Sequence, residues 1–394
     1  MKTTANLATQ IEEALLLRNE ILEGFFFEEK RKLADACREM SERFLIGGRL
    51  LAFGRGACST DAQHVSVEFV HPVIVGKRAL PALDLSALIQ PWLDAICRSE
   101  DIVMGFGPPQ GDPEVWSALD SAHRRGAMTF ALPGDGGSYA LQTSLQDPFV
   151  HQELVEIFYH TLWETVHVFL EHRQLGQDVG QSEFLYPFLG TKKQETSSIV
   201  GEVAESIFMK VCDDTALRRR LAAEESVHLG ATAQAIHDRL AQGGKLIIFG
   251  NGGSATDAND WAMDCVMPQQ GRRSIPAISL SMEPANITAL ANDVGTEVIF
   301  ARQLMAQARP EDIAIGISTS GGSRNIVMAL EEARKRKLLT VALLGNDGGE
   351  IARRGLADFP IIVRSDYIPR IQEVQASAYH IILETLEVLG RGDA

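Results

Sequence analysis

Residues 249–265 read FGNGGSATDANDWAMDC, and residues 53–69 read FGRGACSTDAQHVSVEF. Each stretch follows a short apolar run, and in each a glycine-containing turn leads into a segment with helical character. An internal repeat changes the interpretation of every other segment, because one fold unit then accounts for both places. The chain is therefore predicted to contain two copies of one unit.

Three further pairs of stretches match in the same order. A strand followed by a polar loop, a strand followed by a Gly-Gly turn, and a long helix each occur once per copy. The pairs are DIAIGISTSGGS (312–323) with DIVMGFGPPQGD (101–112), VALLGNDGGEIA (341–352) with TFALPGDGGSYA (129–140), and IQEVQASAYHIILETLEV (371–388) with HQELVEIFYHTLWETVHV (151–168). Four matches in one order indicate a tandem repeat.

The order of short apolar runs and helical stretches predicts an α/β fold, with a parallel sheet flanked by helices in each copy. Residues 5–46 and 195–242 are each interpreted as a pair of helices, a helical hairpin, that ends at Gly-Gly. Residues 173–194 are interpreted as a linker on the surface of a domain. The predicted domains are therefore 1–172 and 195–394.

Composition excludes several classes of protein. The net charge of −15 argues against a nucleic-acid-binding surface, which is usually basic. The five cysteines are odd in number and have no CxxC spacing, which argues against a disulfide framework and a cysteine-only zinc site. No leader segment and no apolar run of about 18 residues is present, so we expect a cytoplasmic protein without a membrane span.

Two loops of the second copy have the composition of a phosphate site. Asn251-Gly-Gly-Ser254 lies between a strand and a helix, where glycine lets the backbone approach an anion and a helix start presents N–H groups. Ser318-Thr-Ser-Gly-Gly-Ser323 follows a second strand and offers four hydroxyls. Either loop alone is equally consistent with a serine-rich helix cap, but the two together favour phosphate binding.

Each copy also offers four candidate metal ligands on two helices. Side chains spaced i, i+4 share one helix face, and imidazole, carboxylate and amide oxygen together suit zinc. The alternative for the second copy is that Asp257 and Asp260 are solvated first-turn residues and that His380 is a core histidine. The sets are Asp260, Asp264, Gln372 and His380 in the second copy, and His64, Glu68, Gln152 and His160 in the first.

Over residues 195–389 the second copy resembles the sugar isomerase (SIS) domain of phosphoheptose isomerases. The resemblance is carried by GNGGS, ANDVGTEVIFARQL, GISTSGGSRNI, and RIQEV followed by His380. It implies two tandem SIS domains, each with a five-stranded parallel sheet, and a tetrameric arrangement with sites at subunit interfaces. It also implies conversion of sedoheptulose 7-phosphate to a glycero-manno-heptose 7-phosphate, with zinc.

The resemblance implies roles for individual residues. Glu68 or Asp264 would be the catalytic base, and His160 or His380 would move a proton at the neighbouring oxygen. Zinc would be bound by the two sets of four given above. The substrate would be bound by Asn251, Gly252, Gly253, Ser254, Asn292, Asp293, Ser318, Thr319, Ser320, Ser323 and Gln372.

Each copy departs from the family in a different part. The family has His and Glu where the second copy has Asp260 and Asp264, although it keeps the phosphate loops. The first copy has the family's metal set, but Gly107-Pro-Pro-Gln-Gly-Asp112 replaces the serine loop. Arg55 and Cys58 also stand where the other copy has Asn and Ser. We expect Asp112 to repel a phosphate.

These observations predict a metal-assisted aldose–ketose isomerase for a phosphorylated sugar. Two other classes of function stay open, namely a non-catalytic SIS module that senses a sugar phosphate and a scaffold for protein interactions. We further expect a homodimer in which the four SIS units form a pseudo-tetramer.

Overall fold

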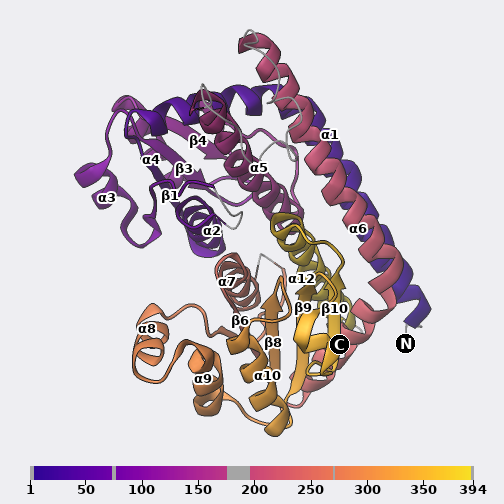
Figure 1. Cartoon of the computed structure of the whole chain (residues 1–394). Helices are drawn as coiled ribbons and strands as arrows, with labels where there is room; N and C mark the ends of the chain where they lie inside the picture. Colours follow the sequence, from indigo (N-terminus) through magenta and orange to yellow (C-terminus); the bar gives the residue numbers. More distant parts are fainter. Residues whose placement is uncertain (1–3, 73–76, 175–195, 269–270, 392–394) are drawn as a thin grey trace. The chain divides into compact units, whose positions relative to one another are not determined.

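The computed structural model of the chain describes residues 4–72, 77–174, 196–268 and 271–391 (Figure 1). It divides into two compact units, Glu20–Thr215 and Met1–Asn19 with Ala216–Ala394, here called the first-copy unit and the second-copy unit. The boundaries between the two units fall inside two long helices. The predicted domains 1–172 and 195–394 instead assign each of these helices to one domain. The predicted linker 173–194 lies, beyond its first two residues, outside the described residues, so these domain boundaries stay a prediction.

The first half of the chain forms a five-stranded sheet with the order β2-β1-β3-β4-β5, in which every pairing is parallel. Helices connect the strands from β1 to β4, and β5 follows β4 without a helix between them. The elements are α1 (Thr4–Leu45), β1 (Leu50–Gly54), α2 (Ser59–Val70), β2 (Ala82–Asp84), α3 (Ile89–Ile96), β3 (Ile102–Phe106), α4 (Pro113–Arg124), β4 (Met128–Leu132), β5 (Tyr139–Ala140) and α5 (Pro148–Gln174).

The second half forms a second parallel sheet with the order β7-β6-β8-β9-β10, which is the same order in terms of chain position. This agreement is what an internal repeat predicts. The elements are α6 (Thr196–Ala241), β6 (Leu246–Gly250), α7 (Gly253–Val266), β7 (Ala277–Ser279), α8 (Pro284–Asp293), α9 (Ile299–Gln307), β8 (Ile313–Ser318), α10 (Arg324–Lys335), β9 (Leu339–Gly345), α11 (Gly349–Arg353), β10 (Phe359–Val363) and α12 (Ile368–Gly390).

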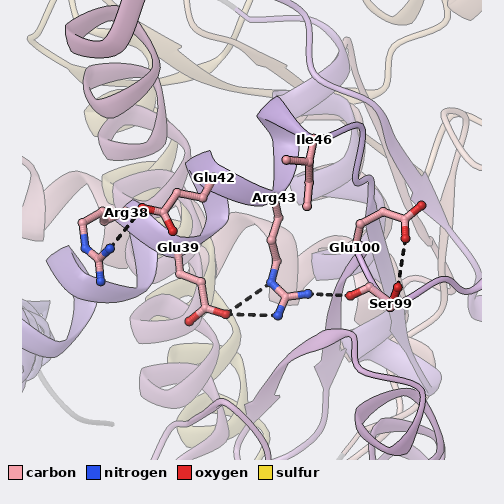
Figure 2. Close-up of a pocket in the computed structure, with 7 residues that line it drawn as sticks. All are labelled: Arg38, Glu39, Glu42, Arg43, Ile46, Ser99 and Glu100. Atoms are coloured by element: carbon pink, nitrogen blue, oxygen red, sulfur yellow. Dashed lines mark hydrogen bonds and ion pairs between the residues drawn. The ribbon is translucent and has the colours of Figure 1, made fainter.

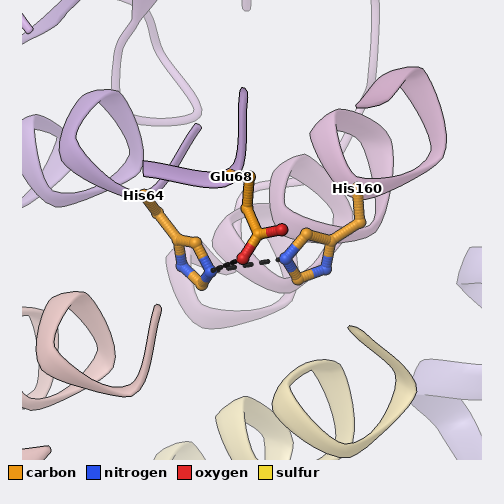
Figure 3. Close-up of side chains that lie close together, drawn as sticks. All are labelled: His64, Glu68 and His160. Atoms are coloured by element: carbon orange, nitrogen blue, oxygen red, sulfur yellow. Dashed lines mark hydrogen bonds and ion pairs between the residues drawn. The ribbon is translucent and has the colours of Figure 1, made fainter. Parts of the chain in front are cut away.

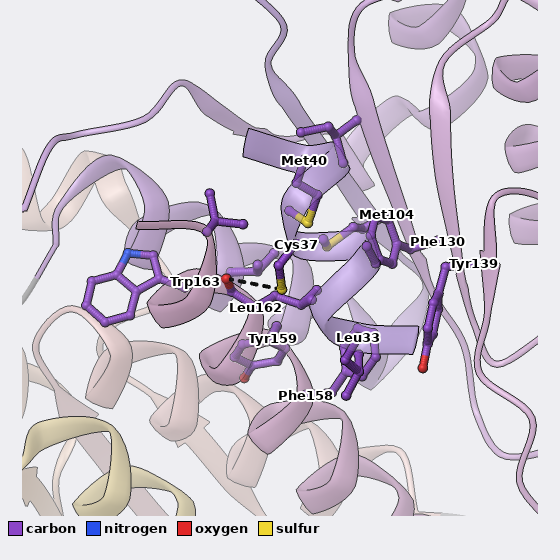
Figure 4. Close-up of a cluster of buried hydrophobic side chains, with 14 of the residues drawn as sticks. Leu33, Cys37, Met40, Met104, Phe130, Tyr139, Phe158, Tyr159, Leu162 and Trp163 are labelled. Atoms are coloured by element: carbon purple, nitrogen blue, oxygen red, sulfur yellow. Dashed lines mark hydrogen bonds between the residues drawn. The ribbon is translucent and has the colours of Figure 1, made fainter. Parts of the chain in front are cut away.

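Both faces of the first sheet are covered, which is why the residues of its central strands are buried throughout and mostly apolar. Leu50 and Ala52 of β1 point into one core with residues of α1, α2 and α5, and part of that core is drawn in Figure 4. Leu51 and Phe53, the alternate residues of the same strand, point into a second core with α3 and α4. The two faces follow the period of two that strand geometry imposes.

The predicted helical hairpins are wrong, because residues 4–45 and 196–241 each form one continuous helix. Neither segment contains a proline. Gly24 lies inside α1, where a side chain would meet no other atom. A glycine inside a helix destabilises it by about 1 kcal/mol relative to alanine, which is too little to interrupt this one. The predicted Gly-Gly ends are confirmed, since Gly47 and Gly243 have φ values of +93° and +86° just beyond each helix.

The second-copy unit contains the start of α1, although α1 belongs to the first half of the chain. The side chains of Leu7 and Ile11 pack against Gly230 of α6. A Cβ added at Gly230 would lie 3.4 Å from Leu7 and 3.5 Å from Ile11. Arg18 forms a 2.7 Å ion pair with Glu384 of α12. The start of α1 is therefore part of the core that supports α12.

The first-copy unit contains, in the same way, the start of α6. Lys210 forms a 2.7 Å ion pair with Glu164 of α5, and Thr215 donates a 2.6 Å hydrogen bond to Glu23 of α1. Glu164 and Glu384 occupy the same position in the matched helices 151–168 and 371–388. Each copy thus uses the start of the other half's long helix. None of the described helices is long and apolar enough to cross a membrane.

Candidate functional site

In the second-copy unit the two predicted phosphate loops start at the carboxyl ends of β6 and β8. These strands are neighbours, with Gly250 paired to Ile317, but the chain leaves them toward opposite edges of the sheet. Such a switch point is the usual place for a ligand in an open α/β sheet. The loops that begin at Asn251 and at Thr319 both start at this point.

The serine loop and the Asn251 loop are tied together by side-chain hydrogen bonds. Ser318 Oγ accepts a 3.1 Å bond from Gly321 N and lies 3.3 Å from Ser323 Oγ. Asn251 and Asn325 exchange two amide bonds of 2.9 and 2.8 Å. Because α7 and α10 begin directly after these loops, two helix N-termini lie next to them. We call this arrangement the cradle.

The cradle depends on glycine at Gly321. Its φ is +60°, and a Cβ there would lie 2.2 Å from the carbonyl oxygen of Gly348. Any side chain would therefore push the serine loop away from the turn after β9. Thr319 is held to that turn as well, since its carbonyl oxygen accepts a 3.4 Å bond from Asn346.

Asn292 and Asp293, which were predicted to contact the sugar, lie exposed at the end of α8. Asn292 donates a 2.8 Å hydrogen bond to Asp293. Among the described hydrogen bonds and ion pairs, none links either residue to the cradle. Their predicted role stays a prediction.

Three of the four candidate metal ligands of the second copy, Asp260, Asp264 and His380, come together. His380 Nε2 lies 3.6 Å from Asp264 Oδ2 and 3.9 Å from Asp260 Oδ2. Tyr379 donates a 2.8 Å hydrogen bond to Asp260 Oδ2, and its ring stacks on that of Trp261. Gln372 is buried two helical turns before His380 on α12.

The first copy also brings its histidine and glutamate ligands together. Figure 3 shows His64 and Glu68 on α2 facing His160 on α5. The two imidazole Nε2 atoms are 3.3 Å apart, and His64 Nε2 lies 3.9 Å from Glu68 Oε1. All three side chains are buried. Burial, together with the charge that His160 carries when protonated, holds the pKa of His64 well below its usual value.

The first-copy residues fit a zinc ion. Two ring nitrogens that are each about 2.0–2.1 Å from a tetrahedral zinc lie about 3.3–3.4 Å apart, which matches the 3.3 Å between His64 and His160. Gln152 uses its amide nitrogen on Asp61 at 3.3 Å, and its Oε1 is a buried acceptor without a hydrogen-bond partner. Neutral imidazoles, a carboxylate and an amide oxygen are an ordinary ligand set for this metal.

In the first copy the place that corresponds to the cradle is filled by the chain's own charges. Asp112 caps α4, because its Oδ1 accepts bonds from Glu114 N at 2.8 Å and Val115 N at 3.2 Å. Arg55 pairs with the same carboxylate at 3.1 Å. The N–H groups that would bind a phosphate are therefore already bound to an aspartate.

A separate hollow of about 720 Å³ in the first-copy unit has no such chemistry (Figure 2). Both of its arginines are engaged by neighbouring groups of the chain. Arg43 pairs with Glu39 at 3.2 Å and bonds the Ser99 carbonyl at 2.7 Å, and Arg38 pairs with Glu42 at 3.1 Å. It does not include a residue of either metal set.

Comparison with known proteins identifies the family. Residues 213–345 match the model of the SIS domain. A phosphoheptose isomerase of Trichlorobacter lovleyi is 42% identical over 176 residues, which is 44% of this chain and 89% of that relative. The chain belongs to the phosphoheptose isomerase family. Membership of that family makes it an isomerase.

Two further comparisons show how far the likeness extends. The phosphoheptose isomerase of Nitratiruptor sp. is 46% identical over 144 residues, or 36% of this chain and 76% of the relative. The C-terminal domain of glucosamine-fructose-6-phosphate aminotransferase from Francisella tularensis covers 99% of this chain and 96% of its own, with a TM-score of 0.61 and 9% identity. That likeness shows the fold alone, and it extends over both copies.

Sequence reasoning missed three contacts of the site. Two of them, Tyr379 with Asp260 and Asn251 with Asn325, join residues that are far apart in the sequence. The third is the N-cap of α4, which is provided by Asp112. One signal was available, because Tyr-His occurs in both matched helices, at 159–160 and 379–380.

Proposed function

We propose that the isomerase interconverts the ketose and aldose forms of a phosphorylated sugar, with sedoheptulose 7-phosphate and a glycero-manno-heptose 7-phosphate as the pair. The observation that carries this proposal is the meeting of a carboxylate and an imidazole on two buried helices in each copy. The cradle adds a place for the phosphate. Both features agree with the substrate that the names of the relatives imply.

The cradle suits the phosphate end of the sugar. Its hydroxyls and helix N-termini donate hydrogen bonds to an anion without a fixed positive charge in the loop. Binding at this end of the substrate orients the carbons at the other end. In an enzyme such remote binding energy lowers the barrier at the reacting atoms.

The carboxylate of Glu68 or Asp264 would take a proton from carbon 1 of the ketose while oxygen 2 gains a proton, which gives an enediol. The same carboxylate then returns the proton to carbon 2, oxygen 1 loses its proton, and the aldose results. No atom or electron is lost in this exchange. A carboxylate in hydrogen-bond reach of the substrate is an effective general base.

The imidazole of His160 or His380 would move the proton between oxygen 1 and oxygen 2. Burial keeps water away from this transfer, since His160 and His380 are both fully enclosed. A zinc ion on one of the two sets of four candidate ligands would supply a Lewis acid for the carbonyl oxygen.

We propose that the first-copy set binds metal before the second-copy set. Its two imidazoles lie at the spacing of zinc ligands. In the second copy Tyr379 already occupies one oxygen of Asp260. Two aspartates beside one histidine also carry more negative charge and suit a harder ion.

Zinc content of matched variants tests this assignment. His160→Ala and His380→Ala each remove one buried imidazole from corresponding positions of the two helices, and circular dichroism checks that both variants fold. We expect His160→Ala to lose the metal and His380→Ala to retain it. If the metal leaves with His380 and stays without His160, the second copy holds the site instead.

A further inference from the structure

The first-copy unit contains a cavity of about 260 Å³ that is separate from both metal sets and from the cradle. One wall is α4, which contributes Trp116, Leu119 and His123 from successive turns of one face. The other wall is Ala131 of β4 and the loop from Asp135 onward. Its lining is mostly apolar, and the polar side chains among the lining residues are Asp120, His123 and Asp135.

The cavity exists because the two copies differ after the fourth strand of each sheet. In the second copy α11 follows that strand, and its Ile351 packs with Val327 and Leu330 of α10 in one buried cluster. The matching stretch of the first copy runs directly into β5. Tyr139, which stands where Ile351 would be, instead joins the core on the other side of the sheet and donates to Glu29.

The indole of Trp116 is held in place before any ligand arrives. Its Nε1 donates a 2.8 Å hydrogen bond to the Pro133 carbonyl. The ring packs so closely on Gly111 that a Cβ there would lie 1.8 Å from Cζ2. The side chain is nevertheless 40% exposed. A fixed aromatic ring that faces an open cavity loses little entropy when a ligand binds to it.

The charges around the cavity are negative. Among the described residues that line it, Asp120 and Asp135 are acidic and none is a lysine or an arginine. Asp120 already pairs with Arg124 on the next turn of α4. Asp135 accepts only a 3.4 Å bond from the Gln142 amide among the contacts of the described residues, so its carboxylate keeps its charge uncompensated.

From this combination we propose that the cavity binds a small organic cation, with its ammonium or guanidinium group over Trp116 and its charge facing Asp135. An indole ring is the aromatic group that attracts cations most strongly, and a carboxylate at the rim adds to that attraction. A phosphate or a sugar phosphate would be repelled by both aspartates. The net charge of −15 also favours the approach of cations over anions.

Choline is a suitable probe, because 3,3-dimethylbutan-1-ol has the same shape without the charge. Binding is measured by ligand-observed NMR on the full chain at constant ionic strength, without any substrate, so the result does not depend on isomerase activity. We expect choline to bind about 5- to 30-fold more tightly than the neutral alcohol, which is the range of a partly desolvated cation–π contact.

Variants assign the binding to this cavity. Trp116→Leu keeps an apolar floor but removes the aromatic ring, and Asp135→Asn removes the charge without changing shape, so each is expected to weaken choline binding several-fold. Trp92→Leu is the matched control, since Trp92 is 47% exposed and lies outside the cavity. Equal binding of choline and the alcohol, unchanged binding in Trp116→Leu, or competition by inorganic phosphate would each overturn the proposal.

Discussion

His151, at the start of α5, makes the first-copy unit sensitive to acid. Its Nε2 lies 3.2 Å from the Gly107 carbonyl oxygen, which can only accept, so Nε2 carries the proton of the neutral ring. Its Nδ1 is buried and has no hydrogen-bond partner within the part of the chain that the structure describes. Burial therefore lowers the pKa of His151 to about 4, although the bond to Gly107 opposes this.

The magnitude follows from the difference between the folded and the unfolded chain. The unfolded chain takes up a proton below about pH 6.5, whereas the folded chain resists until about pH 4. The stability that the neutral ring provides is complete above pH 6.5 and is lost as pH falls toward 4. At about 1.4 kcal/mol per pKa unit the loss reaches about 3 kcal/mol. Burial lowers the pKa of His64 and of His167 as well, which acts in the same direction.

Hydrogen exchange measured by mass spectrometry separates the two units. We expect peptides from residues 20–174 to lose protection between pH 6.5 and 4, after correction for the intrinsic exchange rate. His151→Gln can still donate to Gly107 but cannot gain a proton in this range, so it should reduce the pH dependence of that unit. An identical pH dependence in His151→Gln and the parent protein would refute the reasoning.

Three further predictions concern binding, stability and assembly. Ser320→Ala and Ser323→Ala should each weaken sugar-phosphate binding by about 1–3 kcal/mol, seen as a higher KM, whereas Pro109→Ala should not change it; equal effects would place a phosphate site in the first copy too. Arg18→Met should lower the free energy of unfolding of the second-copy unit by about 1–3 kcal/mol in a urea titration, because the 96% buried Arg18 side chain would no longer pair with Glu384. An unchanged free energy of unfolding would mean that the start of α1 does not stabilise that core. Light scattering at micromolar concentration should give twice the chain mass of 43.1 kDa, and a single-chain mass would exclude the homodimer.

The repeat made the core of each unit predictable. The glycine-containing turns at 54–58 and 250–254 fix where a strand ends and a helix begins, and the same order of elements then follows twice. It was not predictable that the start of each long helix belongs to the unit formed by the other half of the chain. The sequence of residues 4–19 is that of an amphipathic helix, and no local pattern records which of two similar cores it packs against.

The candidate site was predictable where helix geometry alone decides. His64 and Glu68 share a face because they are spaced i, i+4, and the repeat indicated that His160 belongs with them. The competing uses of polar groups were not predictable. Asp112 caps its own helix and Tyr379 bonds Asp260 through tertiary contacts, so spacing in the sequence gave no sign of them.

The central claim is that this chain isomerises a phosphorylated sugar by proton transfer through an enediol. Proton NMR of sedoheptulose 7-phosphate with the purified full chain and zinc in D₂O tests it most directly. We predict that aldose signals appear and that solvent deuterium enters at the carbon that receives the proton. Binding of the sugar phosphate without new signals would indicate a sensor, the absence of binding would indicate a scaffold, and either result would contradict the account.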